Sequence, residues 1–92
     1  MMATIIKVDG SKVKVKPAGA NGKLTLEQLQ AAVGGYIEHL SLPKGGSMFI
    51  DEEGKLKGKQ YNFEATELVR GIIGDDDDIV GDAIVCGEKE IE

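Results

Sequence analysis

The chain changes from helix to strand within one short stretch, Val33-Gly34-Gly35-Tyr36-Ile37-Glu38. A capping box begins the helix, because Thr25 is followed three residues later by Gln28. Three aliphatic residues then recur at helical spacing: Leu26, Leu29 and Val33. The first glycine of the stretch is typical of a helix end, and a strand pattern follows the second. The glycine pair therefore joins a predicted helix over 26–33 to a predicted strand over 36–42.

The remaining elements follow from similar patterns. Four further strands are predicted, over 4–8, 12–16, 47–51 and 79–86. Asn62 can cap a second helix over 63–73. The last strand is apolar on both faces except at Asp82, which is typical of a central strand covered by helices. The order β-β-α-β-β-α-β predicts a single α+β domain over 1–92, with a mostly antiparallel sheet and two helices on one face.

The predicted core is aliphatic, because the chain has two Tyr, two Phe and no Trp. Eight residues are expected in it: Val13, Leu26, Leu29, Val33, Leu68, Val69, Ile72 and Ile84. A chain of 92 residues lies near the lower end of independent stability. We therefore expect self-association into a homodimer or higher oligomer to add burial.

Charge and hydropathy restrict the partners. The net charge of −5 argues against direct binding of nucleic acid, which relies on clustered Lys and Arg. The first quarter of the chain is nevertheless basic, through Lys7, Lys12, Lys14, Lys16 and Lys23. No stretch approaches the ~20 apolar residues of a membrane span, and the N-terminus lacks an apolar signal core. We expect a cytoplasmic protein without a membrane partner.

Residues able to carry catalysis are few. His39 is the only histidine, and no neighbour in sequence supplies an orienting carboxylate or a nucleophile. Cys86, the only cysteine, lies in an apolar run that would leave its thiol inert. The acidic run over 75–78 does not fit a calcium loop, because Ile79 falls where an oxygen ligand belongs. We expect no enzyme, no cofactor and no metal site, and His39→Ala or Cys86→Ala should change stability but abolish no function.

Two stretches remain as candidates for binding. Residues 51–59, Asp-Glu-Glu-Gly-Lys-Leu-Lys-Gly-Lys, form either an exposed hairpin exit or a phosphate site next to the capped start of the second helix. On the second hypothesis Tyr36 and Tyr61 can stack on a base, unless Tyr36 packs in the core. The candidate ligand-binding residues are Tyr36, Glu38, Lys55, Lys57, Asn62 and Thr66. The other candidate is a protein-binding acidic run, which is a solvated loop on the simpler reading: Asp75, Asp76, Asp77 and Asp78.

Four blocks occur in order, at 33–38, at 51–56, at Asn62 with Ala65-Thr66, and at 79–83. Over about 24–86 they resemble a domain of unknown function found in small proteins of bacteriophages, prophages and plasmids. The chain departs from that family where Asp51 replaces a frequent Asn and where Gln60-Tyr61 replaces a Leu-Pro pair. The resemblance transfers no activity.

The mobile-element setting of that family implies an accessory role in the host cell, such as countering a host defence or tuning replication. One hypothesis is that the protein sequesters a small nucleotide signal in a pocket. The alternative is an acidic, DNA-mimic-like inhibitor of a host defence protein or nucleic-acid-processing protein. The Gly-Gly-Tyr and Glu-Gly-Lys blocks favour the first hypothesis, and the acidic run with the negative net charge favours the second.

Overall fold

The predicted helix-to-strand joint is present in the computed structural model, which describes residues 3–43, 45–70, 78–87 and 91. Helix α1 spans Leu26–Val33, and its capping box is complete: Thr25 Oγ1 accepts a hydrogen bond from Gln28 N at 3.1 Å, and Gln28 Oε1 accepts one from Thr25 N at 3.2 Å. Gly34 ends the helix in the left-handed conformation, with φ of 80°. These local predictions are confirmed.

Five described strands form one antiparallel sheet in the order β2-β1-β5-β4-β3. Their bounds are β1 Ala3–Ile6, β2 Lys12–Val15, β3 Ile37–Ser41, β4 Ser47–Asp51 and β5 Ala83–Cys86. The last strand in sequence is therefore the central one, as its apolar pattern indicates. It is shorter than predicted, because Val80 instead forms an isolated bridge with Tyr61. The α+β class is confirmed.

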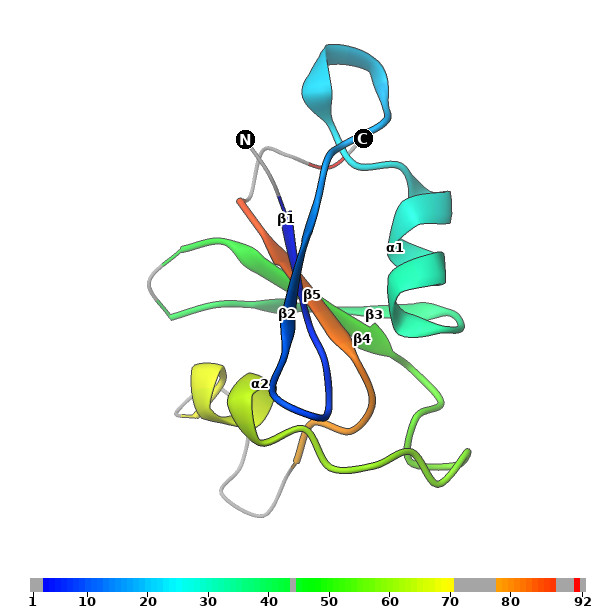
Figure 1. Cartoon of the computed structure of the whole chain (residues 1–92), viewed down its shortest axis with the longest axis vertical. Coiled ribbons are helices and arrows are strands. Elements are labelled where there is room, and N and C mark those ends of the chain that lie inside the picture. Colours follow the sequence, from blue (N-terminus) through cyan, green and yellow to red (C-terminus); the bar gives the residue numbers. More distant parts are fainter. Residues whose placement is uncertain (1–2, 44, 71–77, 88–90, 92) are drawn as a thin grey trace.

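The two helices lie on opposite faces of the sheet, which corrects the prediction that both cover one face. Consecutive strand residues point to opposite faces. Phe49 and Ile84 pack in the cluster that contains α1 residues, whereas Met48 and Ala83 pack with residues of α2, which spans Phe63–Leu68. Figure 1 shows α1 and α2 on opposite sides of the strands. Because β4 and β5 are apolar at successive positions, each face needs its own cover.

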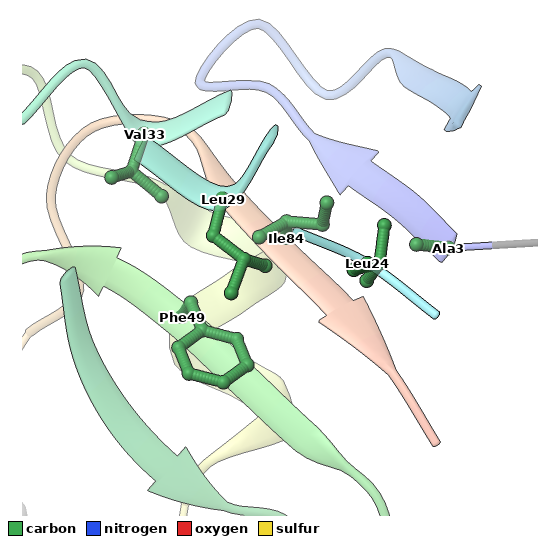
Figure 2. Packing of buried hydrophobic residues seen from close by; sticks show 6 residues of the cluster. All are labelled: Ala3, Leu24, Leu29, Val33, Phe49 and Ile84. Carbon is green, nitrogen blue, oxygen red and sulfur yellow. The ribbon is translucent and has the colours of Figure 1, made fainter. Parts of the chain in front are cut away.

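Two buried clusters result, one on each face. The α1 side contains Ala3, Leu24, Leu29, Val33, Phe49 and Ile84. Figure 2 shows Leu29 of α1 directed toward Phe49 and Ile84 of the sheet. The α2 side contains Ile6, Met48, Ala65, Val69, Ile79 and Ala83. The described part of a one-layer sheet thus has a core on both sides.

Half of the predicted core is confirmed, namely Leu29, Val33, Val69 and Ile84. Three predicted core residues are instead exposed: Val13 at 41%, Leu26 at 55% and Leu68 at 44%. Val13 lies on the edge strand β2, while α1 packs over β3, β4 and β5. Leu26 and Leu68 are the first residue of α1 and the last of α2, and the fully buried Leu24 and Val69 take the inward positions beside them. Ile72 lies outside the described residues, as does the end of the predicted second helix.

The described residues contain one further short helix, η1, over Ala20–Gly22. Asn21 there adopts a left-handed conformation, with φ of 59°. No described helix is long and apolar enough to span a bilayer.

Candidate functional site

The centre of the site is Asp51, at the end of β4. Its Oδ2 lies 2.8 Å from Lys57 Nζ and 2.7 Å from Lys59 Nζ, and its Oδ1 accepts a hydrogen bond from Glu53 N at 2.8 Å. The Asp51 side chain has no exposed surface, while 40% of the Lys57 side chain and 24% of the Lys59 side chain remain exposed. We call Asp51, Lys57 and Lys59 the Asp51 cluster. Two cations facing one anion leave it with one positive charge in excess.

The Asp51 cluster also holds the C-terminus of α1. Lys59 Nζ donates to Val33 O at 2.6 Å, and Lys57 Nζ donates to Gly34 O at 3.3 Å. Carbonyls at a helix C-terminus have no partner within the helix, and cations there also interact favourably with the helix dipole. The turn after β4 is therefore tied to the helix-to-strand joint by its two lysines.

Two glycines leave room for these contacts. A Cβ on Gly35 would lie 2.6 Å from Lys57 Nζ and 2.9 Å from both carboxylate oxygens of Asp51. A Cβ on Gly81 would lie 2.7 Å from Lys59 Cδ. Three of the four sequence blocks, at 33–38, 51–56 and 79–83, thus meet around one buried carboxylate. Their glycines serve close packing here, which the ligand hypothesis did not anticipate.

Asp51 is held in its charged form. Burial by itself raises the pKa of this carboxyl, but the hydrogen bonds from Lys57, Lys59 and Glu53 N outweigh it, so the pKa falls well below its ordinary value of 3.8. The hydrogen bond to Asp51 in turn raises the pKa of Lys57. Asp51 is therefore a permanent anion near neutral pH and not a group that exchanges protons.

A shallow depression of about 250 Å³ lies beside the cluster, lined by Gln30, Gly35, Tyr36, Glu53 and Lys57. Tyr36 is 68% exposed, so the alternative that it packs in the core is wrong. The structure brings Tyr36 and Lys57 together, as the ligand hypothesis requires. Gln30 and Glu53 were not among the predicted residues. Gln30 lies on the last turn of α1, and its backbone carbonyl accepts hydrogen bonds from Gly34 N and Gly35 N. This position next to the glycine pair is the one feature of the sequence that could have indicated Gln30.

Asn62 and Thr66 do not belong to this site, which corrects the hypothesis that they read a ligand. Both are buried, at 0% and 1% exposure. Asn62 Oδ1 accepts from Ala65 N, and Asn62 Nδ2 donates to Ile6 O and to Gly81 O. Thr66 Oγ1 donates to Asn62 O and accepts from Ile79 N. Asn62 thus caps α2 as predicted, and the polar atoms of both side chains form hydrogen bonds within the fold.

The other predicted binding residues lie apart from the depression. Glu38 is exposed on β3, opposite Ile50, and Lys55 is exposed in the turn after β4, but neither lines the depression. Asp78 is exposed. The remaining residues of the acidic run, Asp75, Asp76 and Asp77, lie outside the described residues.

His39 has a hydroxyl neighbour that the sequence did not predict. Its Nε2 lies 2.9 Å from Ser47 Oγ, and its ring stacks on Phe49 with centroids 5.1 Å apart. Ser47 pairs with Cys86 across β4 and β5. Only 4% of Ser47 is exposed, and its hydroxyl serves as the hydrogen-bond partner of the His39 ring. The described residues contain no group of three or more His, Cys, Asp or Glu side chains able to hold a metal ion.

The chain belongs to a family of domains of unknown function, DUF3846, whose model matches residues 2–92. The match extends beyond the 24–86 segment that carries the resemblance of its sequence blocks. Neither the search of curated proteins nor the search of solved structures returned a match. The family assignment therefore brings no activity with it.

Proposed function

We propose that this protein is a non-enzymatic binding module that holds a small nucleotide in the depression beside the Asp51 cluster. The observation that supports this most is Tyr36, an aromatic side chain that is 68% exposed and lines the same depression as Lys57. An exposed aromatic ring offers a surface on which a base can stack, and a neighbouring ammonium offers a contact for phosphate.

Lys57 is already positioned for this contact. Its ammonium donates to Asp51 and to Gly34 O, so two of its three N–H groups hold it in place and the third is uncommitted within the described structure. A donor that is fixed before binding loses little conformational entropy when a ligand arrives. Binding depends on the local potential, to which the Lys57 ammonium contributes a positive charge and the neighbouring Glu53 carboxylate a negative one. A phosphate contact therefore depends on the Lys57 ammonium itself and not on an excess of positive charge.

The other lining residues favour a base with exocyclic amino groups. The Glu53 carboxylate can accept hydrogen bonds from such groups, and the Gln30 amide can both donate and accept. Among the described residues, none is hydrogen bonded to the Gln30 side chain or to the Tyr36 hydroxyl. The depression is smaller than a typical ligand pocket of roughly 300–1,000 Å³, so it would hold the base and one phosphate while the rest of the ligand stays in solvent.

A thermal-shift panel of cyclic and linear nucleotides tests the proposal. A ligand at one hundred times its Kd stabilises the native state by about 2.7 kcal/mol, which for a domain of this size raises Tm by roughly 10 °C or more. Protein purified from cells is also denatured, and any released compound is identified by mass spectrometry. Release of an intact nucleotide is expected, since the protein binds its ligand without converting it.

Tyr36→Ala and Tyr61→Ala form a matched pair of variants for this test. Tyr61 is also partly exposed, at 40%, but it packs edge-to-face against Phe63, with centroids 6.5 Å apart, and does not line the depression. The shift should disappear in Tyr36→Ala and persist in Tyr61→Ala. A panel in which no nucleotide raises Tm, or in which the two variants respond alike, would refute the proposal.

The biological setting of this proposal comes from the resemblance to proteins of mobile elements. In it the protein acts in the host cytoplasm and lowers the free concentration of a nucleotide signal used in defence. Capture of a host protein by the acidic run is the alternative. Only Asp78 of that run is among the described residues, and none of the described contacts favours this role. Pull-down of one host protein that depends on residues 75–78, without any nucleotide shift, would support that alternative.

Self-association is part of the same proposal, because a small aliphatic domain gains burial in a dimer. Light scattering over a range of concentrations should give a mass above that of one 9.8 kDa chain. A strict monomer at every concentration would remove this part of the proposal and leave nucleotide binding untouched.

A further inference from the structure

A second group of lysines lies on the outermost strand, away from the depression. Lys12 and Lys14 are exposed on β2, and the exposed Lys16 follows directly after it. Within the described structure no carboxylate forms an ion pair with any of the three, and the polar contact of their ammoniums is Lys14 Nζ with Thr4 Oγ1 at 3.3 Å. We call these three residues the β2 lysines. Their ammonium groups therefore do not stabilise the described fold through ion pairs.

The backbone of β2 has an open edge. The strand order places β1 on one side of β2, and no described strand pairs with the other side, although Lys16 O, just beyond β2, accepts a hydrogen bond from Gln28 Nε2 of α1. The two faces of the strand differ in chemistry: Lys12 and Lys14 stand opposite Ile6 and Thr4 on the side of α2, whereas Val15 packs against the cluster on the side of α1. An unpaired edge with alternating cationic and aliphatic side chains can accept another strand.

We propose that β2 binds an extended acidic segment of a partner protein, which adds to the sheet as a further strand. Alternate residues of such a segment are acidic and face the β2 lysines, and the residues between them are aliphatic and lie beside Val13 and Val15. Side chains on one face of a strand repeat about every 7 Å, so carboxylates at alternate positions of the partner come into register with the lysines.

Two other occupants fit less well. A second copy of β2 would bring lysine opposite lysine, and like charges directly opposite one another destabilise a strand pair. Single-stranded nucleic acid binds through aromatic stacking as well as charge, and the β1–β2 hairpin contains no aromatic residue. The other sheet edge, β3, carries Glu38 among its exposed residues and would repel an acidic segment.

Fluorescence anisotropy with a labelled, capped peptide of alternating glutamate and valine tests the proposal. The peptide should bind at low salt, more weakly at high salt, and amide NMR spectra of the protein should change at β2 and not at β3. Changing all three β2 lysines to glutamine should weaken binding by about tenfold, the effect expected of a few exposed charge pairs. Lys14→Gln should weaken binding more than Lys23→Gln, which removes the same charge outside β2.

Two further probes separate strand addition from simple charge attraction. The same peptide methylated at alternate backbone nitrogens keeps its charge but cannot form the full ladder, so it should bind more weakly. An oligothymidylate should bind less tightly than the peptide. Equal binding by the methylated peptide, tighter binding by the oligothymidylate, or unchanged binding by the triple lysine variant would each overturn the proposal. None of these three outcomes depends on whether a nucleotide binds beside Tyr36 and raises Tm.

Discussion

Lysines serve opposite purposes in two regions of this molecule. In the Asp51 cluster, Lys57 and Lys59 neutralise a carboxylate with no exposed surface and hold the end of α1. On β2, Lys12 and Lys14 stand in solvent without an ionic partner in the described structure. Both groups have the same alternating spacing in the sequence, Lys-x-Lys-x-Lys. The position of one buried carboxylate decides which group stabilises the fold and which remains available for a partner.

The comparison also changes the meaning of the glycine-rich blocks. Short motifs of glycine and charged residues are often ligand loops, but Gly35 and Gly81 here make room for the Asp51 cluster. Substitutions around the Asp51 cluster should therefore affect stability, whereas substitutions of the β2 lysines should leave it nearly unchanged.

Asp51→Asn should have the largest effect. It leaves two ammonium groups facing each other without their anion, and breaking a buried pair in this way costs about 3–5 kcal/mol. Because both lysines keep some exposure to water, we expect a loss near the lower bound, about 3 kcal/mol, which lowers Tm by roughly 10–25 °C. Urea unfolding measures it. Asp9→Asn, in an exposed turn where Asp9 Oδ1 accepts from Ser11, should destabilise the protein far less, and equal losses in the two variants would contradict our interpretation of the cluster.

The same free energy should depend on pH in a defined window. Because the pKa of Asp51 is lowered in the folded state, its contribution is fully present above the unfolded value of 3.8 and is lost as the pH falls from there toward the folded pKa. The difference in unfolding free energy between wild type and Asp51→Asn should stay constant from pH 7 to about pH 5 and shrink below about pH 4. A difference that shrinks already near neutral pH would show that Asp51 is not held as an anion.

Gly35→Ala should cost about 2 kcal/mol, within the range of overpacked substitutions. The added Cβ would meet Lys57 Nζ and both oxygens of Asp51, whereas the φ of Gly35 is not positive and adds no strain. Gly58→Ala provides the complementary control, because Gly58 has open space around its Cβ position but a φ of 68°. It should cost about 1 kcal/mol from backbone conformation alone. Thermal unfolding that ranks Gly58→Ala as the worse variant would argue against crowding at Gly35.

Lys59→Gln and Lys14→Gln should give the smallest and most direct contrast. Loss of the Lys59 contacts to Asp51 and to Val33 O should cost about 1–2 kcal/mol, since hydrogen bonds to charged groups are the stronger ones. Lys14→Gln should change the unfolding free energy by less than about 0.5 kcal/mol. Similar losses in these two variants would mean that the β2 lysines also support the fold.

The candidate site was predictable only in part. Tyr36 and Lys57 were both proposed, since an aromatic after a glycine pair and a lysine-rich turn are recognisable in sequence. Gln30 and Glu53 were missed, because they join the depression only through the contact between α1 and the turn after β4. The ligand-binding role predicted for Asn62 and Thr66 is wrong, because burial and contacts with distant segments, which the sequence does not specify, direct the polar atoms of both side chains into the fold.

The sequence by itself determined the local elements: the capped helix α1 and its glycine end, the capped start of α2 and the strand patterns on either side of short turns. These depend on hydrogen bonds and side-chain periodicities within a few residues, so neighbouring residues suffice to predict them. Tertiary structure alone decided that the helices lie on opposite faces and that Lys57 and Lys59, but not Lys12 and Lys14, meet Asp51. Those outcomes depend on where distant segments pack together, because an ion pair needs its two charges within a few ångströms and spacing along the chain does not specify that distance.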